Sequence, residues 1–148
     1  MTPKARLRPG TPDDRAAVVA LVESEGLSAD GIDAGLAGFV IAEEEGRVIG
    51  VAGLERYGAF GLLRSVAVAG DRRGLGLGAR LTGAVIEDSR RQGLATLYAL
   101  TTTAMAYFPR QGFEAIERTR VPEAVRASAE FTAMCPASAI ALELRLSR

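Results

Sequence analysis

The feature that most constrains the fold is a strand-loop-helix pattern over residues 59–93. It begins with a nearly apolar run, residues 59–70, which is typical of a strand in the middle of a sheet. Apolar residues at helical spacing then predict a helix of about four turns that ends near Gly93: Leu77, Leu81, Val85 and Ile86. Three glycines in alternate positions separate the two elements. We therefore expect the chain to pass from a central strand through a tight loop directly into a helix.

The glycine loop can be compared with three known phosphate-binding patterns. A Walker A loop requires Gly-Lys-Ser/Thr where this chain reads Gly-Ala-Arg, so that pattern fails. The dinucleotide pattern G-x-G-x-x-A fits Gly74, Gly76 and Ala79, but no acidic residue follows about 20 positions later. A third pattern, Arg/Gln-x-x-Gly-x-Gly/Ala, fits Arg73, Gly76 and Gly78. Its backbone N–H groups and helix N-terminus would suit a pyrophosphate without a metal, although a plain strand-to-helix turn is the alternative.

The rest of the chain supplies further strands and helices. A first helix is expected to begin behind Thr11 and Pro12 and to run to about Glu25. The remaining strands are expected at residues 6–8, 39–42, 47–54, 94–101, 113–121 and 140–146, and the remaining helices at 103–112 and 122–129. The last strand should place four apolar residues on one face: Ile140, Leu142, Leu144 and Leu146. No linker is apparent, so residues 1–148 are predicted to form a single α/β domain with a mixed sheet.

Composition excludes several classes of function. Eighteen basic residues balance eighteen acidic ones, so no bulk charge favours nucleic acid or a membrane surface. The chain has no histidine and only Cys135, which excludes histidine-based triads, disulfides within the chain and zinc sites built on cysteine; we expect no metal. There is neither a secretory signal nor an apolar run of about 18 residues, so a cytoplasmic protein is expected.

Three segments together resemble the GNAT superfamily of acetyl-CoA-dependent N-acetyltransferases. They are LRPGTPDD at residues 7–14, LLRSVAVAGDRRGLGLGARL at residues 62–81 and TTTAMAYFPRQGF at residues 101–113. Within the superfamily, LRSVAV and LTTTAMAYF most resemble the amino-acid acetyltransferases of the N-acetylglutamate synthase kind. The tail VPEAVRASAEFTAMCPASA, residues 121–139, is similar to small acetyltransferases encoded with arsenic-resistance genes.

This resemblance implies a fold and an activity. The fold would be a mixed, mostly antiparallel central sheet with helices on both faces. The activity would be direct acetyl transfer from acetyl-CoA to the amine of a small molecule, such as an amino acid or an amino-acid-like toxic compound. A homodimer through the strand at residues 140–146 is a further expectation, if that strand forms a free edge. The alternatives are a non-catalytic coenzyme-binding regulatory module and a protein or peptide N-acetyltransferase.

The resemblance also implies which residues hold acetyl-CoA. The strand at residues 63–68 would splay from its neighbour and pair with the pantetheine arm through its main chain at Val66 and Val68, on either side of Ala67. The pyrophosphate would lie on the N–H groups of the loop, with the Arg73 side chain nearby. The loop residues are Arg73, Gly74, Leu75, Gly76, Leu77, Gly78 and Ala79, and Phe108 occupies the position where many relatives carry a tyrosine beside the coenzyme.

For the catalytic side chains, the sequence leaves more than one role open for each candidate. A backbone N–H near Val66 is the expected oxyanion donor. Tyr107 is a candidate acid for the leaving thiolate, although it could equally be a core residue beside Phe108 and Pro109. Glu55 is the candidate base, acting directly or through a water, although an acid at a strand end can also be a solvated surface charge.

Two polar residues, Arg64 and Ser65, interrupt the apolar central strand. Arg64 could pair with a neighbouring carboxylate on an exposed face, or its planar guanidinium could hold the carboxylate of an amino-acid acceptor. Ser65 and Thr102 are further candidates for the acceptor site. Cys135 could attract arsenic, but a lone thiol makes a poor site for trivalent arsenic, and a small buried residue is the alternative.

Overall fold

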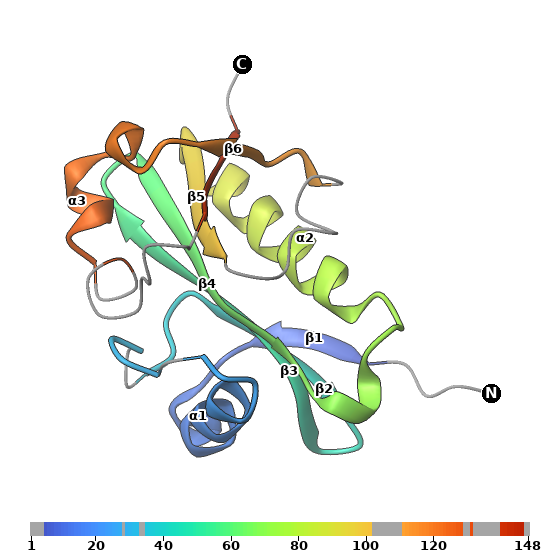
Figure 1. Cartoon of the computed structure of the whole chain (residues 1–148). Coiled ribbons are helices and arrows are strands. Elements are labelled where there is room, and N and C mark those ends of the chain that lie inside the picture. The colour runs from blue at the N-terminus through green and yellow to red at the C-terminus, as the bar shows by residue number, and fades with distance from the viewer. Residues whose placement is uncertain are drawn as a thin grey trace.

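The computed structural model describes residues 5–27, 29–32, 35–101, 111–128, 131 and 140–146 (Figure 1). The strands of this part of the chain are β1 Arg6–Pro9, β2 Phe39–Glu44, β3 Arg47–Tyr57, β4 Phe60–Val68, β5 Thr96–Thr101, β6 Glu114–Ile116 and β7 Ile140–Arg145. The α-helices are α1 Arg15–Ser24, α2 Leu77–Arg91 and α3 Glu123–Arg126. Short 3-10 turns lie at Pro12–Asp14, Gly70–Arg72 and Arg118–Arg120.

The strands form one sheet of order β1-β2-β3-β4-β5-β7-β6. All neighbouring strands run antiparallel except β4 and β5, which are parallel. Helix α2 covers one face of the sheet, and α1 and α3 lie on the other (Figure 1). The prediction of a mixed, mostly antiparallel sheet with helices on both faces is confirmed.

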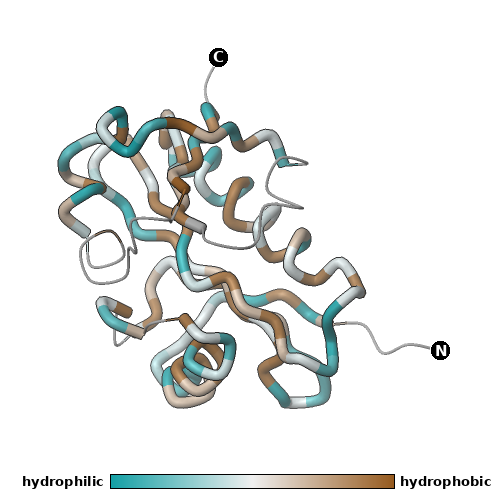
Figure 2. Tube along the Cα trace, viewed as in Figure 1, coloured by the Kyte–Doolittle hydropathy of each residue, from teal (hydrophilic) through white to brown (hydrophobic). Residues whose placement is uncertain are grey.

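The helix that follows the glycine loop forms as its apolar spacing predicts. Leu77, Leu81, Val85 and Ile86 are all buried and pack on the sheet in the largest core cluster. Gly93 follows the helix with φ +79°, a left-handed conformation that favours glycine and ends a helix. Figure 2 shows the inner strands as mainly hydrophobic and the turn before α2 as hydrophilic. The opposite face holds two smaller clusters, one under α1 and one under α3.

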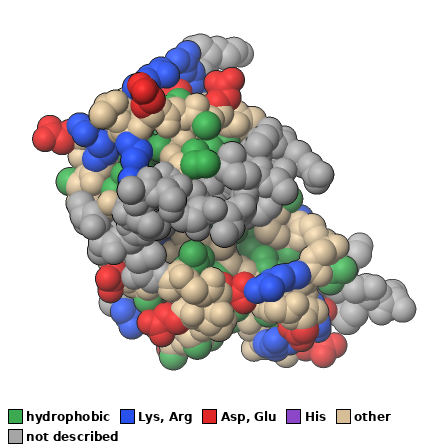
Figure 3. Space-filling model, viewed as in Figure 1, with side chains coloured by type: hydrophobic (Ala, Val, Ile, Leu, Met, Phe, Trp, Pro, Cys, Tyr) green, Lys and Arg blue, Asp and Glu red, His purple; other side chains and the backbone are tan. Residues whose placement is uncertain are grey.

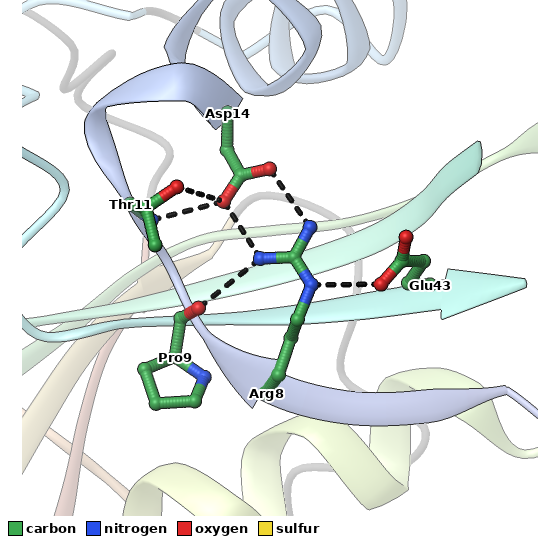
Figure 4. Close-up of polar contacts among 5 residues, drawn as sticks. All are labelled: Arg8, Pro9, Thr11, Asp14 and Glu43. Carbon is green, nitrogen blue, oxygen red and sulfur yellow. Dashed lines mark hydrogen bonds and ion pairs between the residues drawn. The ribbon is translucent and has the colours of Figure 1, made fainter. Parts of the chain in front are cut away.

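The N-terminus of the first helix is fixed by a cluster of charges (Figure 4). The Asp14 carboxylate accepts hydrogen bonds from the Thr11 backbone N–H at 2.9 Å and from the Thr11 hydroxyl at 3.1 Å. Two guanidinium nitrogens of Arg8 donate to the same carboxylate, at 2.7 and 2.8 Å, and Nε of Arg8 donates to Glu43 of β2 at 2.8 Å. Arg8 therefore ties β1 to β2 and to the start of the helical segment, and the hydrogen bonds from Arg8 hold the pKa of Asp14 well below its usual range.

Three expectations for the C-terminal part need correction. The strand expected over 113–121 is only β6, because residues 118–120 turn into a 3-10 helix ahead of Pro122. Ile140 is exposed at the start of β7, whereas Leu142 and Leu144 are buried as predicted. The last strand is not a free edge, because β7 pairs with β5 on one side and β6 on the other. The helix expected at 103–112 lies almost wholly outside the described residues.

Acidic and basic residues are equal in number in the sequence, and they are mixed on the surface (Figure 3). Figure 3 shows basic and acidic side chains interspersed over the face that it draws. Within the described residues, no helix combines the length and the apolarity that crossing a membrane would require.

Candidate active site

The parallel strands β4 and β5 separate partway along their length. Their register runs from Phe60 opposite Thr96 to Leu63 opposite Ala99 and then stops, although β4 continues to Val68. Beyond that point, among the residues that the structure describes, β5 pairs with β7 alone. Residues 64–68 of β4 therefore present a stretch of strand edge toward the opening between the two halves of the sheet, as the resemblance implied.

A β-bulge lies on β4 where this opening begins. Val51 pairs with Ala67 and Gly53 pairs with Arg64, so Ala52 of β3 faces two residues of β4, Ser65 and Val66. Ser65 has φ +58°, in the left-handed region that non-glycine residues rarely adopt. The bulge therefore changes the direction of the backbone just before the segment expected to pair with the coenzyme.

The glycine loop has the geometry expected of an anion nest. Gly74 and Gly76 have φ +81° and +79°, and Gly76 is the N-cap of α2. A Cβ placed on either glycine would meet no heavy atom within 4 Å, so the space in front of the loop is open. The first turn of α2 carries no acidic residue that would repel an anion. The positive end of the α2 dipole thus lies beside open space, which is what an anion-binding loop requires.

Ion pairs hold the turn that leads into this loop. Nε of Arg72 donates to the buried carboxylate of Glu44 at 2.6 Å, and Arg47 binds Asp71 through two contacts of 3.0 Å. The Arg73 side chain is largely exposed and pairs with Glu25 at the end of α1. The loop is thereby attached to β2, β3 and α1.

The other predicted loop residues differ in what they expose. Leu75 is 61% exposed, whereas the Leu77 side chain is buried in the core, so Leu77 can offer only its backbone to a ligand. Gly78 and Ala79 lie in the first turn of α2, and the Ala79 carbonyl accepts a hydrogen bond from the Gln111 amide at 3.1 Å. Val66 and Val68 direct their side chains to the core under α2, and Ala67 directs its methyl group to the core under α1.

A buried polar network links the end of β3 to the bulge. The Arg64 side chain is fully buried; its Nη1 donates to Oε2 of Glu55 at 2.9 Å and its Nε donates to the Ser65 hydroxyl at 2.9 Å. The Tyr57 hydroxyl donates to Oε1 of Glu55 at 2.7 Å. Burial and the adjacent carboxylate of Glu55 raise the pKa of Tyr57 to about 12, so this phenol stays protonated at neutral pH.

This network gives Arg64 a carboxylate partner and shows where the Glu55 side chain lies. Arg64 pairs with a neighbouring carboxylate, but it does so in the protein interior and not on an exposed face. The Glu55 side chain is 20% exposed and lines an open pocket of about 470 Å³ between β3 and the α1–β2 connection. Sequence reasoning gave no role to Tyr57, although its place two residues after Glu55 puts both side chains on one face of β3.

Four candidate residues lie outside the described residues: Thr102, Tyr107, Phe108 and Cys135. Their predicted roles stay predictions. Within the described part of the chain, no group of three or more acidic or cysteine side chains could hold a metal ion.

Comparison with curated proteins finds amino-acid acetyltransferases. The chain is 34% identical over 118 residues to the amino-acid acetyltransferase of Ralstonia nicotianae, which covers 72% of this chain and 26% of that protein. It is 34% identical over 131 residues to the amino-acid acetyltransferase of Ectopseudomonas mendocina, which covers 82% of this chain and 30% of that protein. The chain thus spans between about a quarter and a third of the length of these relatives.

Two solved structures share the fold over nearly the whole chain. The N-acetylglutamate synthase of Neisseria gonorrhoeae, complexed with coenzyme A and N-acetyl-glutamate, has a TM-score of 0.83 at 24% identity and covers 100% of this chain and 36% of that chain. Rv2747 of Mycobacterium tuberculosis, in complex with CoA, has a TM-score of 0.83 at 24% identity and covers 96% of this chain and 99% of that chain. Residues 13–113, more than half of the sequence, match the family described as the acetyltransferase (GNAT) family. Together with the opening beside β4 and the glycine loop that caps α2, this match establishes that the chain belongs to the GNAT family of acetyltransferases.

Proposed function

We propose that this protein transfers the acetyl group of acetyl-CoA to the amine of a free amino acid or a closely related small molecule. The observation that carries the proposal is the continuous segment from Ser65 to Ala79, which combines the part of β4 beyond its register with β5 and an open glycine loop at a helix N-terminus. The pantetheine arm pairs with the main chain at Val66 and Val68, and the pyrophosphate lies on the N–H groups of residues 73–79. Every one of these contacts uses backbone, so the loop requires glycine more than any particular side chain.

The chemistry requires a neutral amine, a stabilised oxyanion and a proton for the leaving thiolate. A backbone N–H near Val66, in the bulge on β4, is the proposed oxyanion donor, because the regular pairing of β4 with β3 is interrupted there and its register with β5 has already ended at Leu63. Glu55 is the proposed base; it is partly exposed in the pocket at the end of β3 and can take the proton of the ammonium group directly or through a water. Tyr107 is kept as the proposed acid.

An amino acid is the acceptor class that the relatives favour, since the curated proteins that match are named amino-acid acetyltransferases. The finer proposal of an amino-acid-like toxic compound, such as an arsenical, depends on residues 121–139. Most of that segment lies outside the described residues. The carboxylate of such an acceptor needs a cationic partner, and Arg64 reaches it only if Glu55 releases the guanidinium.

The test is a thiol-release assay with acetyl-CoA and a panel of acceptors. The panel contains free glutamate, aspartate, their arsenical and phosphinate analogues, and short peptides with a free N-terminus. Turnover with a free amino acid or analogue and none with the peptides is expected. Peptide turnover alone would favour the protein acetyltransferase, and acetyl-CoA binding without turnover on any acceptor would favour a coenzyme-binding regulatory module.

A further inference from the structure

Arg64 is placed to control backbone geometry at the opening beside β4. Its side chain has no exposed surface, and the hydrogen bonds of Nη1 and Nε join Glu55 of β3 to the Ser65 hydroxyl in the bulge. The guanidinium thus contacts the bulge directly through Nε. Burying it is costly unless its charge is paired, and Glu55 provides that pairing.

Ser65 needs such a partner because of its conformation. With φ +58° it occupies a region where an L-residue other than glycine is strained, and strain of this kind persists only where the surroundings hold it. The hydrogen bond from Nε of Arg64 to Oγ of Ser65, at 2.9 Å, is the side-chain contact that fixes the residue.

The conformation of Ser65 determines on which face of the sheet each following side chain of β4 lies. Leu63 and Val66 both pack in the core under α2, although strict alternation along a strand would put residues three apart on opposite faces. Ala67 accordingly packs under α1. If Ser65 relaxed to an extended conformation, every following residue of β4 would exchange faces, and the backbone N–H groups would turn with them.

We propose that Arg64 is a positioning residue that holds Ser65 in its left-handed conformation and thereby aims the backbone N–H of Val66 at the carbonyl oxygen of the bound thioester. This inference rests on the proposed acetyl transfer. Tyr57 and Glu55 also contribute to this positioning. The Tyr57 hydroxyl orients one carboxylate oxygen of Glu55, and the other oxygen orients Arg64. A chain of three hydrogen bonds thus runs from the end of β3 to the Ser65 hydroxyl in the bulge.

The test measures how strongly the protein polarises bound acetyl-CoA, so it needs no acceptor. Infrared difference spectra of unlabelled and carbonyl-¹³C acetyl-CoA give the stretching frequency of the bound thioester carbonyl, which falls when an N–H donates to it. The variants are Arg64→Lys, Ser65→Ala and Ser65→Gly. Ser89→Ala is the matched control, because Ser89 is also buried but donates its hydroxyl to the Val85 carbonyl within α2. Calorimetric titration gives the Kd of acetyl-CoA for each.

The expected result separates the three variants. In the wild type and in Ser89→Ala, binding lowers the thioester carbonyl frequency by the same amount. In Arg64→Lys and Ser65→Ala most of this shift is lost, while the Kd of acetyl-CoA changes less than roughly tenfold. Ser65→Gly retains most of the shift, because glycine adopts a positive φ without the hydrogen bond.

Other results overturn the inference in distinguishable ways. A full shift in Arg64→Lys and Ser65→Ala, or equal losses in Ser65→Ala and Ser65→Gly, would overturn the positioning role while leaving acetyl transfer in place. A wild-type carbonyl frequency equal to that of free acetyl-CoA would do the same. Failure of the wild-type protein to bind acetyl-CoA would instead reject the proposed function, and this inference with it.

Discussion

Replacing Gly76 separates what the glycine loop does for folding from what it does for binding. The residue has φ +79°, and a Cβ there meets no heavy atom within 4 Å. Gly76→Ala therefore adds backbone strain of about 1 kcal/mol and no clash in the free protein, which lowers Tm by roughly 2–4 °C. Gly76→Glu carries the same strain and also places a negative charge where the pyrophosphate is expected.

The added repulsion can be estimated from the geometry of an exposed loop. At a separation of about 5 Å and an effective dielectric constant of about 40, each phosphate charge repels the Glu carboxylate by about 1.7 kcal/mol. Two phosphate charges give about 3 kcal/mol, which raises the Kd of acetyl-CoA more than roughly a hundredfold. Calorimetric titration with acetyl-CoA and thermal unfolding of the same samples measure both effects.

Gly46 provides a matched control. It lies in the turn between β2 and β3 with φ +80°, and a Cβ there also meets no heavy atom within 4 Å. Gly46→Ala and Gly46→Glu should therefore lose the same stability as the Gly76 variants and keep the wild-type Kd. An unchanged Kd in Gly76→Glu, or an equal rise in Gly46→Glu, would refute the assignment of the loop to the coenzyme.

Three further predictions concern groups outside the loop. Arg8 lowers the pKa of Asp14 below the model-peptide value of 3.8, so the stability that Asp14 contributes is present above about pH 4 and is lost as the pH falls further. In urea unfolding, Asp14→Asn should lower the free energy of unfolding at neutral pH by about 2 kcal/mol and should reduce the loss of stability between neutral and acidic pH. A loss of stability in acid equal to that of the wild type would contradict this prediction. The Thr82 hydroxyl is buried without a partner in the described part of the chain, so Thr82→Val should stabilise by up to about 1 kcal/mol in the same assay, and a loss would contradict this. Burial and Glu55 raise the pKa of Tyr57 from 10 to about 12, so its contribution to stability is present below pH 10 and is lost as the pH rises toward 12. The alkaline phenolate titration should therefore lose a step near pH 12 in Tyr57→Phe, and an unchanged titration would contradict this.

The parts of the fold that sequence could predict are those set by periodicity. The buried residues of α2 recur at helical spacing, and a glycine ends the helix, so the strand-loop-helix unit was predictable to within a residue or two. The alternate glycines predicted a tight loop between the strand and the helix, and two of them, Gly74 and Gly76, have a positive φ in the structure. The short β6 was predicted too long, because the apolar content of residues 113–121 does not distinguish a strand from a strand followed by a 3-10 turn.

The bulge on β4 was not predictable, and the reason is physical. A strand buried on both faces reads as a continuous apolar run, so its sequence holds no alternation from which a change of face could be detected. Val66 would be apolar whichever side of the sheet it faced, and the pattern of residues 60–68 is therefore the same with or without an extra residue. Only the polar pair Arg64 and Ser65 departs from that pattern, and by itself it fits equally well an ion pair or a contact to the acceptor.

The hairpin between β3 and β4 indicates which residue Arg64 pairs with, whereas the sequence of β4 alone does not. Tyr57 pairs with Phe60 across a two-residue turn, and this register puts Arg64 opposite Gly53 and diagonal to Glu55. In this position the Arg64 guanidinium reaches the Glu55 carboxylate, with Nη1 donating to Oε2 at 2.9 Å. Counting from the turn at residues 58–59 pairs these two charges before either one is assigned to a substrate. The position of Arg64 then follows from topology, and its chemistry follows from that position: a cation already neutralised inside the sheet is better placed to fix the backbone beside it than to reach a ligand.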